Sequence, residues 1–126
     1  MIVGIGTDIV AIPRLLRSLE RRGEDFARHL LAEAEWSEYL AVNDKARFLA
    51  KRFAVKEAFS KACGTGIRPP LSLKGIWVEH DDLGRPILKF ELIIQDWLTQ
   101  RHGPCVCHLS ISDEKEQALA FVIIET

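Results

Sequence analysis

Apolar residues alternate with small or polar residues over positions 2–10, and this two-residue period predicts that the chain opens with a β-strand. One side of the strand carries Val3, Ile5, Thr7 and Ile9, and the other carries Gly4, Gly6 and Asp8. Strand-like patterns recur at residues 75–80, 85–89, 105–112 and 117–125. The first two of these form a hairpin across Asp81-Asp82-Leu83-Gly84, and the last two flank a charged turn.

Apolar residues spaced three and four apart predict helices between these strands. The first helix has Pro13 in its opening turn, ends at Gly23, and buries a stripe of Ile12, Leu15, Leu16 and Leu19. One or two short helices follow over residues 25–41, and another covers residues 90–101. Strands and helices do not alternate regularly, so the predicted class is α+β with a mostly antiparallel sheet.

The longest predicted helix runs from an N-cap at Asp44 to Cys63 and is ended by Gly64. It has two apolar stripes, of which one holds Phe48, Val55, Phe59 and Ala62 and the other Leu49 and Phe53. Charged residues separate the two apolar stripes. Arg52 and Lys56 lie between the stripes on one side of the helix, and Glu57 and Lys61 lie between them on the other. Arg47 and Lys51 lie at the edge of the side that carries Glu57 and Lys61. A surface helix needs only one polar face, so we expect at least one charged stripe to line a cleft.

Length and composition indicate one domain over residues 1–126 without a membrane span, and we expect a soluble, cytoplasmic protein. Three cysteines, Cys63, Cys105 and Cys107, make no disulfide framework, and we expect them to be core thiols in a reducing compartment. The net charge of -1 argues against a nucleic-acid binder. Two local basic groups nevertheless predict two anionic partners: Arg14, Arg17, Arg21, Arg22 and Arg28, and then Arg47, Lys51, Arg52, Lys56 and Lys61.

Asp8, Glu57 and Lys61 are the candidate chemical groups. Glu57 and Lys61 lie four residues apart, which is also the spacing of an ordinary helix ion pair, and Asp8 could equally cap the helix that follows it. Small neighbours at Ala50 and Ala54 leave space beside the charges. Because two carboxylates with nearby cations suit Mg²⁺ and phosphate, the residues predict a possible Mg²⁺-phosphate site.

Four segments together resemble the small bacterial holo-acyl-carrier-protein synthases of the 4′-phosphopantetheinyl transferase superfamily. They are GIGTDIV at residues 4–10, FLAKRFAVKEA at 48–58 continuing through Lys61 to GTGI at 64–67, HLSISD at 108–113 and AFVIIE at 120–125. The order, the spacing and the total length match, so the resemblance covers nearly the whole chain. It implies that residues 1–126 form a single domain of the transferase fold.

The resemblance also implies a reaction. The phosphopantetheine group of coenzyme A would pass to a serine of an apo-acyl carrier protein, with release of adenosine 3′,5′-bisphosphate, in support of fatty acid biosynthesis. Asp8 and Glu57 would hold Mg²⁺, Lys61 would balance phosphate charge, and Glu57 or a metal-bound water would take the serine proton. Coenzyme contacts would come from Arg52, Lys61, Gly64, Thr65, Gly66 and His108.

Partners follow from the same resemblance. The acidic carrier protein would dock on Arg14, Arg17 and Arg21, although a row of arginines is often only a solvated face. Active sites would lie between subunits of a homotrimer. A coenzyme phosphate could be reached by Lys45 or Arg47, and Asp113-Glu114 stands where relatives have histidine or threonine. The rival hypotheses are a small Mg²⁺ nuclease and a non-catalytic coenzyme-binding module.

Overall fold

The computed structural model describes residues 1–126 and contains five strands and five α-helices. The strands are β1 (Ile2–Ala11), β2 (Ile76–His80), β3 (Pro86–Phe90), β4 (Val106–Asp113) and β5 (Gln117–Glu125). The helices are α1 (Ile12–Arg22), α2 (Glu24–Leu30), α3 (Trp36–Ala41), α4 (Lys45–Cys63) and α5 (Leu92–His102). Two short 3₁₀ turns, η1 (Glu33–Glu35) and η2 (Leu73–Gly75), complete the regular structure. The α+β prediction is confirmed.

The predicted ends of the long helix are also found. The Asp44 side chain accepts a hydrogen bond from the Arg47 backbone N–H, and Gly64 follows the last turn in the left-handed conformation. One prediction for the first helix is wrong: Leu16 is 45% exposed, whereas Ile12 and Leu15 are buried. The apolar stripe of α1 is therefore narrower than the sequence pattern indicates.

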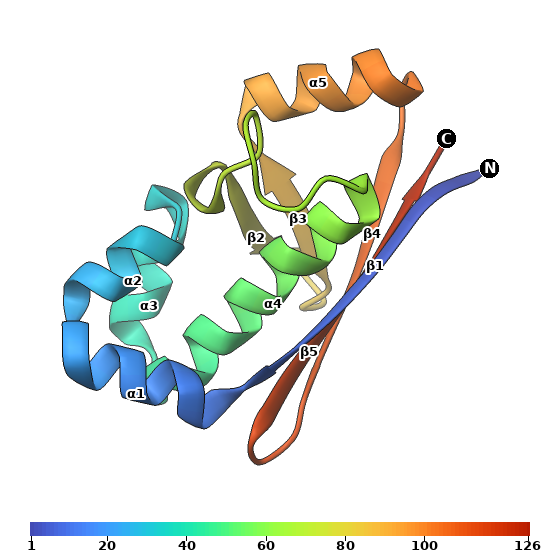
Figure 1. Ribbon diagram of the computed structural model, residues 1–126. Coiled ribbons are helices and arrows are strands. Elements are labelled where there is room, and N and C mark those ends of the chain that lie inside the picture. The colour runs from blue at the N-terminus through green and yellow to red at the C-terminus, as the bar shows by residue number, and fades with distance from the viewer.

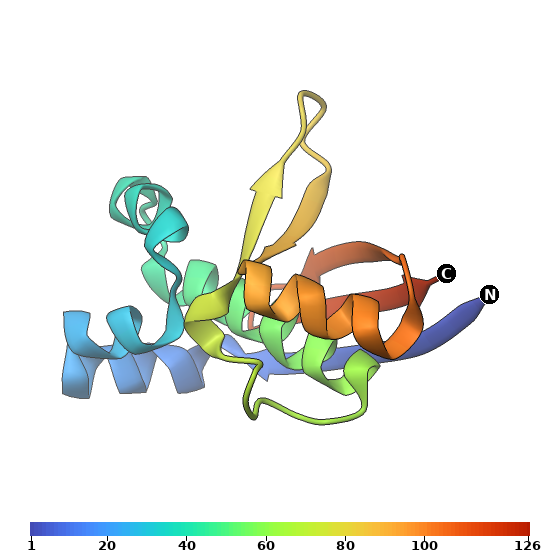
Figure 2. The same ribbon diagram turned by 90° about the horizontal axis from the view of Figure 1, so that it is seen from above.

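The strands form two antiparallel sheets. One has the order β1-β5-β4, and the other is the β2-β3 hairpin. Helix α4 crosses one face of the three-stranded sheet, while α1, α2 and α3 gather beyond its N-terminal end (Figure 1). The hairpin stands out from the rest of the chain (Figure 2). The two sheets meet where β3 contacts β4.

Glycines in β1 allow α4 to lie directly on the strand. A Cβ atom added at Gly4 would clash with the backbone oxygen of Ala62, and one added at Gly6 would clash with that of Ala58. The backbones of strand and helix therefore approach more closely than any side chain at these positions would permit. This close approach brings Asp8, the next residue on the same side of β1, up to α4.

Gly6→Ala is expected to lower the free energy of unfolding by about 1–3 kcal/mol, because the added methyl group must push α4 off the strand. Urea unfolding of the purified variant measures this change. Ser37→Ala is the control, since Ser37 is exposed on α3, away from the contact between β1 and α4. Equal stability of the two variants would contradict the proposed packing.

The other face of the three-stranded sheet is apolar and uncovered. Ile5 and Ile9 of β1 are 60% and 57% exposed, and Leu119 and Phe121 of β5 are 37% and 36% exposed. The antiparallel register places Ile9 beside Leu119 and Ile5 beside Ile123. The side of β1 with the larger apolar residues is thus the exposed one, and the glycine side faces the core.

None of the helices combines the length and the apolar character that a membrane-spanning helix requires.

Candidate active site

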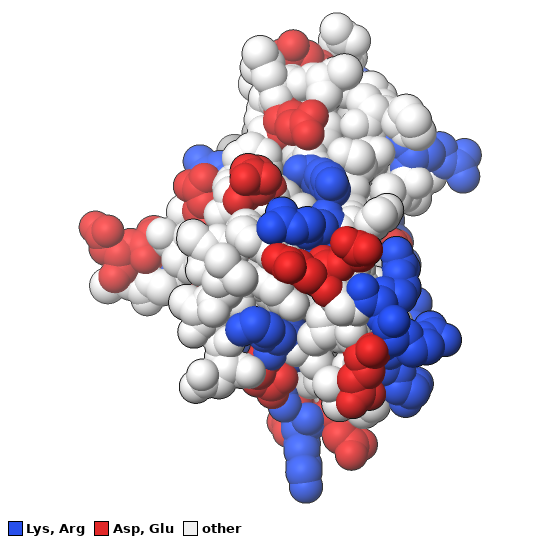
Figure 3. Space-filling model, turned by 90° about the vertical axis from the view of Figure 1, so that its left-hand side faces the viewer, with Lys and Arg blue, Asp and Glu red and all other residues white.

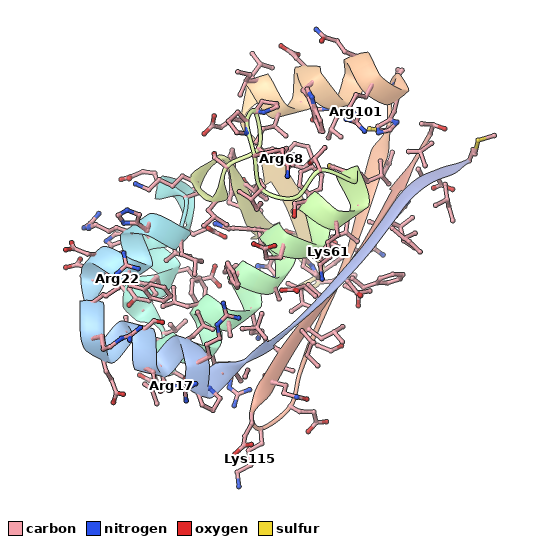
Figure 4. All side chains as sticks on the ribbon, viewed as in Figure 1. Arg17, Arg22, Lys61, Arg68, Arg101 and Lys115 are labelled. Carbon is pink, nitrogen blue, oxygen red and sulfur yellow. The ribbon has the colours of Figure 1, made fainter.

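Asp8 and Lys61 meet where α4 crosses β1. The Lys61 Nζ donates to Asp8 Oδ1 at 3.2 Å and to the Thr7 carbonyl oxygen at 3.0 Å. Figure 4 shows the Lys61 side chain between α4 and β1. The Asp8 side chain is 17% exposed and that of Lys61 is 54% exposed, so the pair is open to solvent on one side. Asp8 does not cap α1, because Ala11 occupies the N-cap position. The capping alternative for Asp8 is therefore excluded.

Glu57 lies one turn before Lys61 on α4, beside the pair of Asp8 and Lys61. Burial raises the pKa of the Glu57 carboxyl, and the negative charge of Asp8 raises it further, while Lys61 and Arg14 act in the opposite direction. Lys61 pairs with Asp8 and not with Glu57, so the ordinary helix ion pair is not formed. The structure thus brings together Asp8, Glu57 and Lys61, although they come from segments far apart in the sequence.

The two carboxylates are suited to a divalent cation. Their mutual repulsion, which contributes to the raised pKa of Glu57, would be relieved by a positive ion between them. The chain has no cluster of three or more histidine, cysteine, aspartate or glutamate side chains in metal-binding arrangement. Two carboxylates agree with Mg²⁺, which commonly takes one or two from the protein and fills its remaining positions with water and substrate phosphate.

The glycine loop follows directly at the end of α4. The backbone N–H groups of Thr65 and Gly66 both donate to the Ser60 carbonyl oxygen, and Gly64 N–H donates to that of Lys61. Open space lies beside Gly64 and Gly66, each of which has a positive φ. The loop therefore leaves room for a ligand within one turn of Lys61.

Arg52 lies on the opposite side of α4 from Glu57 and Lys61, in the wall of a pocket of about 400 Å³. The pocket opens between the N-terminal half of α4, α3 and the β2–β3 hairpin, and its charged lining is Glu38, Asp44, Arg47, Lys51, Arg52 and His80. The structure thus separates Arg52 from the carboxylate pair within one chain.

A buried ion network holds Arg52 in place. The Lys56 Nζ, which is fully buried, donates to Glu35 Oε1 at 2.7 Å and to the carbonyl oxygens of Leu30 and Leu73. Burial lowers the pKa of Lys56, against the opposing effect of the Glu35 charge. Glu35 Oε2 lies 3.6 Å from Arg52 Nε, which has no hydrogen-bond partner although it is buried. Glu35 was not predicted from the sequence.

Lys45 and Arg47 differ in position. Arg47 lines the same pocket as Arg52, whereas the Lys45 Nζ turns back to the carbonyl oxygens of Val42 and Leu40. Arg47 is therefore the better candidate for a phosphate contact. His108 lies on the uncovered face of the sheet, 53% exposed, where it pairs with Glu125 at 3.0 Å. It faces away from the carboxylate pair of its own chain.

The α1 arginines form part of a basic margin. Arg14, Arg17 and Arg21 are all exposed. Lys and Arg side chains gather along one edge of the face made by α1, α2 and α3, with a few acids between them (Figure 3). A groove of about 290 Å³ opens beside Arg14 and is lined by Leu15, Phe26 and Phe53. We call Arg14, Arg17, Arg21 and this groove the α1 surface; its apolar part was not predicted.

The three cysteines are free thiols, and none belongs to a group of three or more possible metal ligands. Cys63 is buried, and Cys105 and Cys107 are partly buried against the core. Burial raises the pKa of Cys63 and of Cys107 to about 12. The thiols of Cys63 and Cys107 are therefore poor nucleophiles, as expected of core residues.

Comparison with known proteins places these features in a family. The sequence model of the 4′-phosphopantetheinyl transferase superfamily matches residues 4–122. Holo-[acyl-carrier-protein] synthases from Laribacter hongkongensis and Nitrosomonas eutropha are 52% and 54% identical over 125 residues, which make up 99% of this chain and 99% of each relative.

Comparison with solved structures points to the same family. The crystal structure of holo-[acyl-carrier-protein] synthase from Neisseria meningitidis has a TM-score of 0.94 at 42% identity and covers 100% of both chains. That of the Bacillus anthracis synthase in complex with CoA (3′,5′-ADP) has a TM-score of 0.83 at 38% identity, covering 100% of this chain and 98% of that one. The chain therefore belongs to the 4′-phosphopantetheinyl transferase superfamily and, within it, to the holo-[acyl-carrier-protein] synthases.

Proposed function

We propose that the chain transfers 4′-phosphopantetheine from coenzyme A to a serine of apo-acyl carrier protein, with Mg²⁺, and releases adenosine 3′,5′-bisphosphate. The observation that carries this proposal is the meeting of Asp8, Glu57 and Lys61 beside the α1 surface. The names of the relatives supply the acyl carrier protein, and the synthase solved with CoA supplies the coenzyme. The reaction serves fatty acid biosynthesis in the cytoplasm.

Asp8, Glu57 and Lys61 have different roles in the proposed reaction. Asp8 and Glu57 hold Mg²⁺, which when bound supplies positive charge to the phosphates of the coenzyme. Lys61 donates to the same phosphates, and its exposed ammonium group already lies at the carboxylates. The serine oxygen forms a bond to the phosphorus next to pantetheine, and the bond from that phosphorus to the bridging oxygen of the pyrophosphate breaks. The serine proton passes to Glu57, directly or through a water molecule.

The nucleotide end of the coenzyme occupies the pocket beside Arg52 in this proposal, and we call it the nucleotide pocket. Arg47, Lys51 and Arg52 offer it positive charge, and the hairpin closes the pocket from the other side. Within one chain the body of α4, about 10–12 Å across with its side chains, separates this pocket from Asp8 and Glu57. One coenzyme molecule therefore needs the carboxylates of one subunit and the pocket of another.

A homotrimer would provide such shared sites. The uncovered sheet face, formed by Ile5, Ile9, Leu119 and Phe121, is the surface that we propose to be buried between subunits. An apolar patch of this kind is uncommon on a monomeric protein. His108 lies on the same face and would be carried toward a neighbouring subunit.

The carrier protein docks on the α1 surface in this proposal. Exposed arginines attract an acidic partner, and the groove lined by Leu15, Phe26 and Phe53 accepts an apolar side chain from it. Arg14 also lies close enough to Glu57 to lower its pKa, so the docking surface adjoins the carboxylates. A serine presented here would reach the site directly.

Reversing the charge of Arg17 and Arg21 to glutamate is expected to raise the KM for the carrier protein about tenfold or more and to leave the KM for coenzyme A within about twofold. Arg14 is left unchanged because its positive charge lowers the pKa of Glu57, so its replacement could alter the active site as well as docking. Steady-state rates at varied carrier and coenzyme concentrations measure both values. The control, Lys74→Glu with Lys89→Glu, makes the same change in net charge at two exposed residues outside both binding surfaces. An equal loss for both substrates would place the docking surface elsewhere.

The rival functions differ in their products. A nuclease would cleave nucleic acid and leave coenzyme A intact, and a binding module would retain the coenzyme unchanged. Chromatography of a mixture of protein, Mg²⁺, coenzyme A and apo-carrier protein is expected to show adenosine 3′,5′-bisphosphate accumulating only when all four are present. Unchanged coenzyme A in the complete mixture would contradict the proposal.

A further inference from the structure

We propose that Asp113 sets the affinity of the nucleotide pocket for phosphate, because it shares two of the pocket's cations and offsets their charge. This inference rests on the proposed function, in which the nucleotide of coenzyme A occupies that pocket. The resemblance to the synthases assigns no role to Asp113. The role follows instead from its contacts.

Asp113 is the last residue of β4 and touches two cations of α4. Its Oδ2 accepts a hydrogen bond from Arg47 Nη1 at 2.8 Å, and its Oδ1 lies 3.7 Å from the Lys51 Nζ. Both cations line the nucleotide pocket. The Asp113 side chain is 33% exposed, so its charge is only partly screened by water. A phosphate that bound Arg47 and Lys51 would therefore be repelled by the carboxylate of Asp113, which already contacts both cations.

Arg47 does not depend on Asp113 for its position. Its Nε donates to Asp44 Oδ2 at 3.1 Å, and its Nη atoms donate to the backbone oxygens of Glu114 at 2.7 Å and Lys115 at 2.8 Å. Three acceptors besides Asp113 therefore hold the guanidinium against the pocket wall. Removing the Asp113 charge should leave Arg47 in place and make it more attractive to an anion.

The third cation of the pocket has counter-ions of its own. Arg52 contacts Glu38 at 3.3 Å and lies 3.6 Å from the buried Glu35. Asp113 is thus the acid that two pocket cations share, so removing its charge acts on Arg47 and Lys51 together.

Asp113→Asn tests this directly, because asparagine keeps the size and a hydrogen-bond acceptor but removes the charge. Calorimetric titration with coenzyme A and with adenosine 3′,5′-bisphosphate is expected to give a Kd about fivefold lower for both ligands than in the wild-type protein. The control is Glu114→Gln, which removes one negative charge from the adjacent position. Only the backbone oxygen of Glu114 touches Arg47, so its Kd should change less than about twofold.

The outcomes separate the inference from the proposed function. Weaker or unchanged binding by Asp113→Asn, or equal gains in the two variants, would overturn the role of Asp113 while the wild-type protein still bound coenzyme A. Failure of the wild-type protein to bind coenzyme A would overturn the proposed function and this inference with it. Tighter binding by Asp113→Asn alone would support the inference.

Discussion

Asp8→Asn and Glu57→Gln are each expected to lower the rate of phosphopantetheine transfer by about a thousandfold while the protein remains folded. Both changes keep the shape of the side chain and remove one of the two charges proposed to hold Mg²⁺. Because the two carboxylates repel each other, Glu57→Gln should melt at or above the wild-type temperature when Mg²⁺ is absent. Transfer rates at saturating coenzyme A with Mg²⁺ measure the first effect, and thermal melting of the metal-free proteins measures the second.

Asp96→Asn is the matched control, since Asp96 is an exposed acid on α5 and should tolerate the same chemical change. Its transfer rate should equal that of the wild-type protein within about twofold. A rate for Glu57→Gln within tenfold of wild type at ordinary Mg²⁺ would show that the metal is held elsewhere. Loss of folding in Glu57→Gln would instead mean that Glu57 stabilises the fold.

Phe121→Lys is expected to convert the proposed homotrimer to monomers and to lower transfer by at least about a hundredfold. Phe121 lies in the middle strand of the uncovered sheet face, opposite Thr7 on one side and Ser110 on the other. A lysine there would place an unpaired charge within an apolar interface. The loss of activity follows because the carboxylates and the nucleotide pocket of one chain lie on opposite sides of α4. Light scattering coupled to gel filtration measures the mass, and the transfer assay measures the activity.

Leu92→Lys provides the comparison, because Leu92 is 74% exposed on α5, away from the sheet face. It should remain trimeric and active. A wild-type protein that is monomeric and fully active at assay concentration would contradict the shared site. So would a monomeric Phe121→Lys variant that retained full activity.

Much of the fold could be predicted because hydrophobic periods dictate the elements. The two-residue period of 117–125 coincides with β5, and the two apolar stripes of 44–63 indicated that α4 is packed on both sides. What the pattern could not show was which side of β1 faces the helix. Ile5 and Ile9 resemble core residues in isolation, but Gly4 and Gly6 face α4 because only glycine permits that approach.

The candidate site was predicted where local spacing carried the information. Glu57 and Lys61 share one side of α4, and Asp8 was marked by its place in an apolar strand. Glu35 was missed because a single glutamate in a polar stretch has no distinguishing pattern, and only tertiary packing buries it beside Lys56. Asp113 and Arg47 are 66 residues apart, and their pairing depends on how β4 meets the start of α4.

Intact mass spectrometry of the carrier protein tests the central claim most directly. After incubation with this protein, Mg²⁺ and coenzyme A, an apo-acyl carrier protein is expected to gain the mass of one phosphopantetheine group. A carrier whose acceptor serine is replaced by alanine should gain nothing, and neither should the wild-type carrier when the Mg²⁺ is chelated. An unchanged carrier mass in the complete mixture, with protein that is folded and binds coenzyme A, would contradict the proposed transfer.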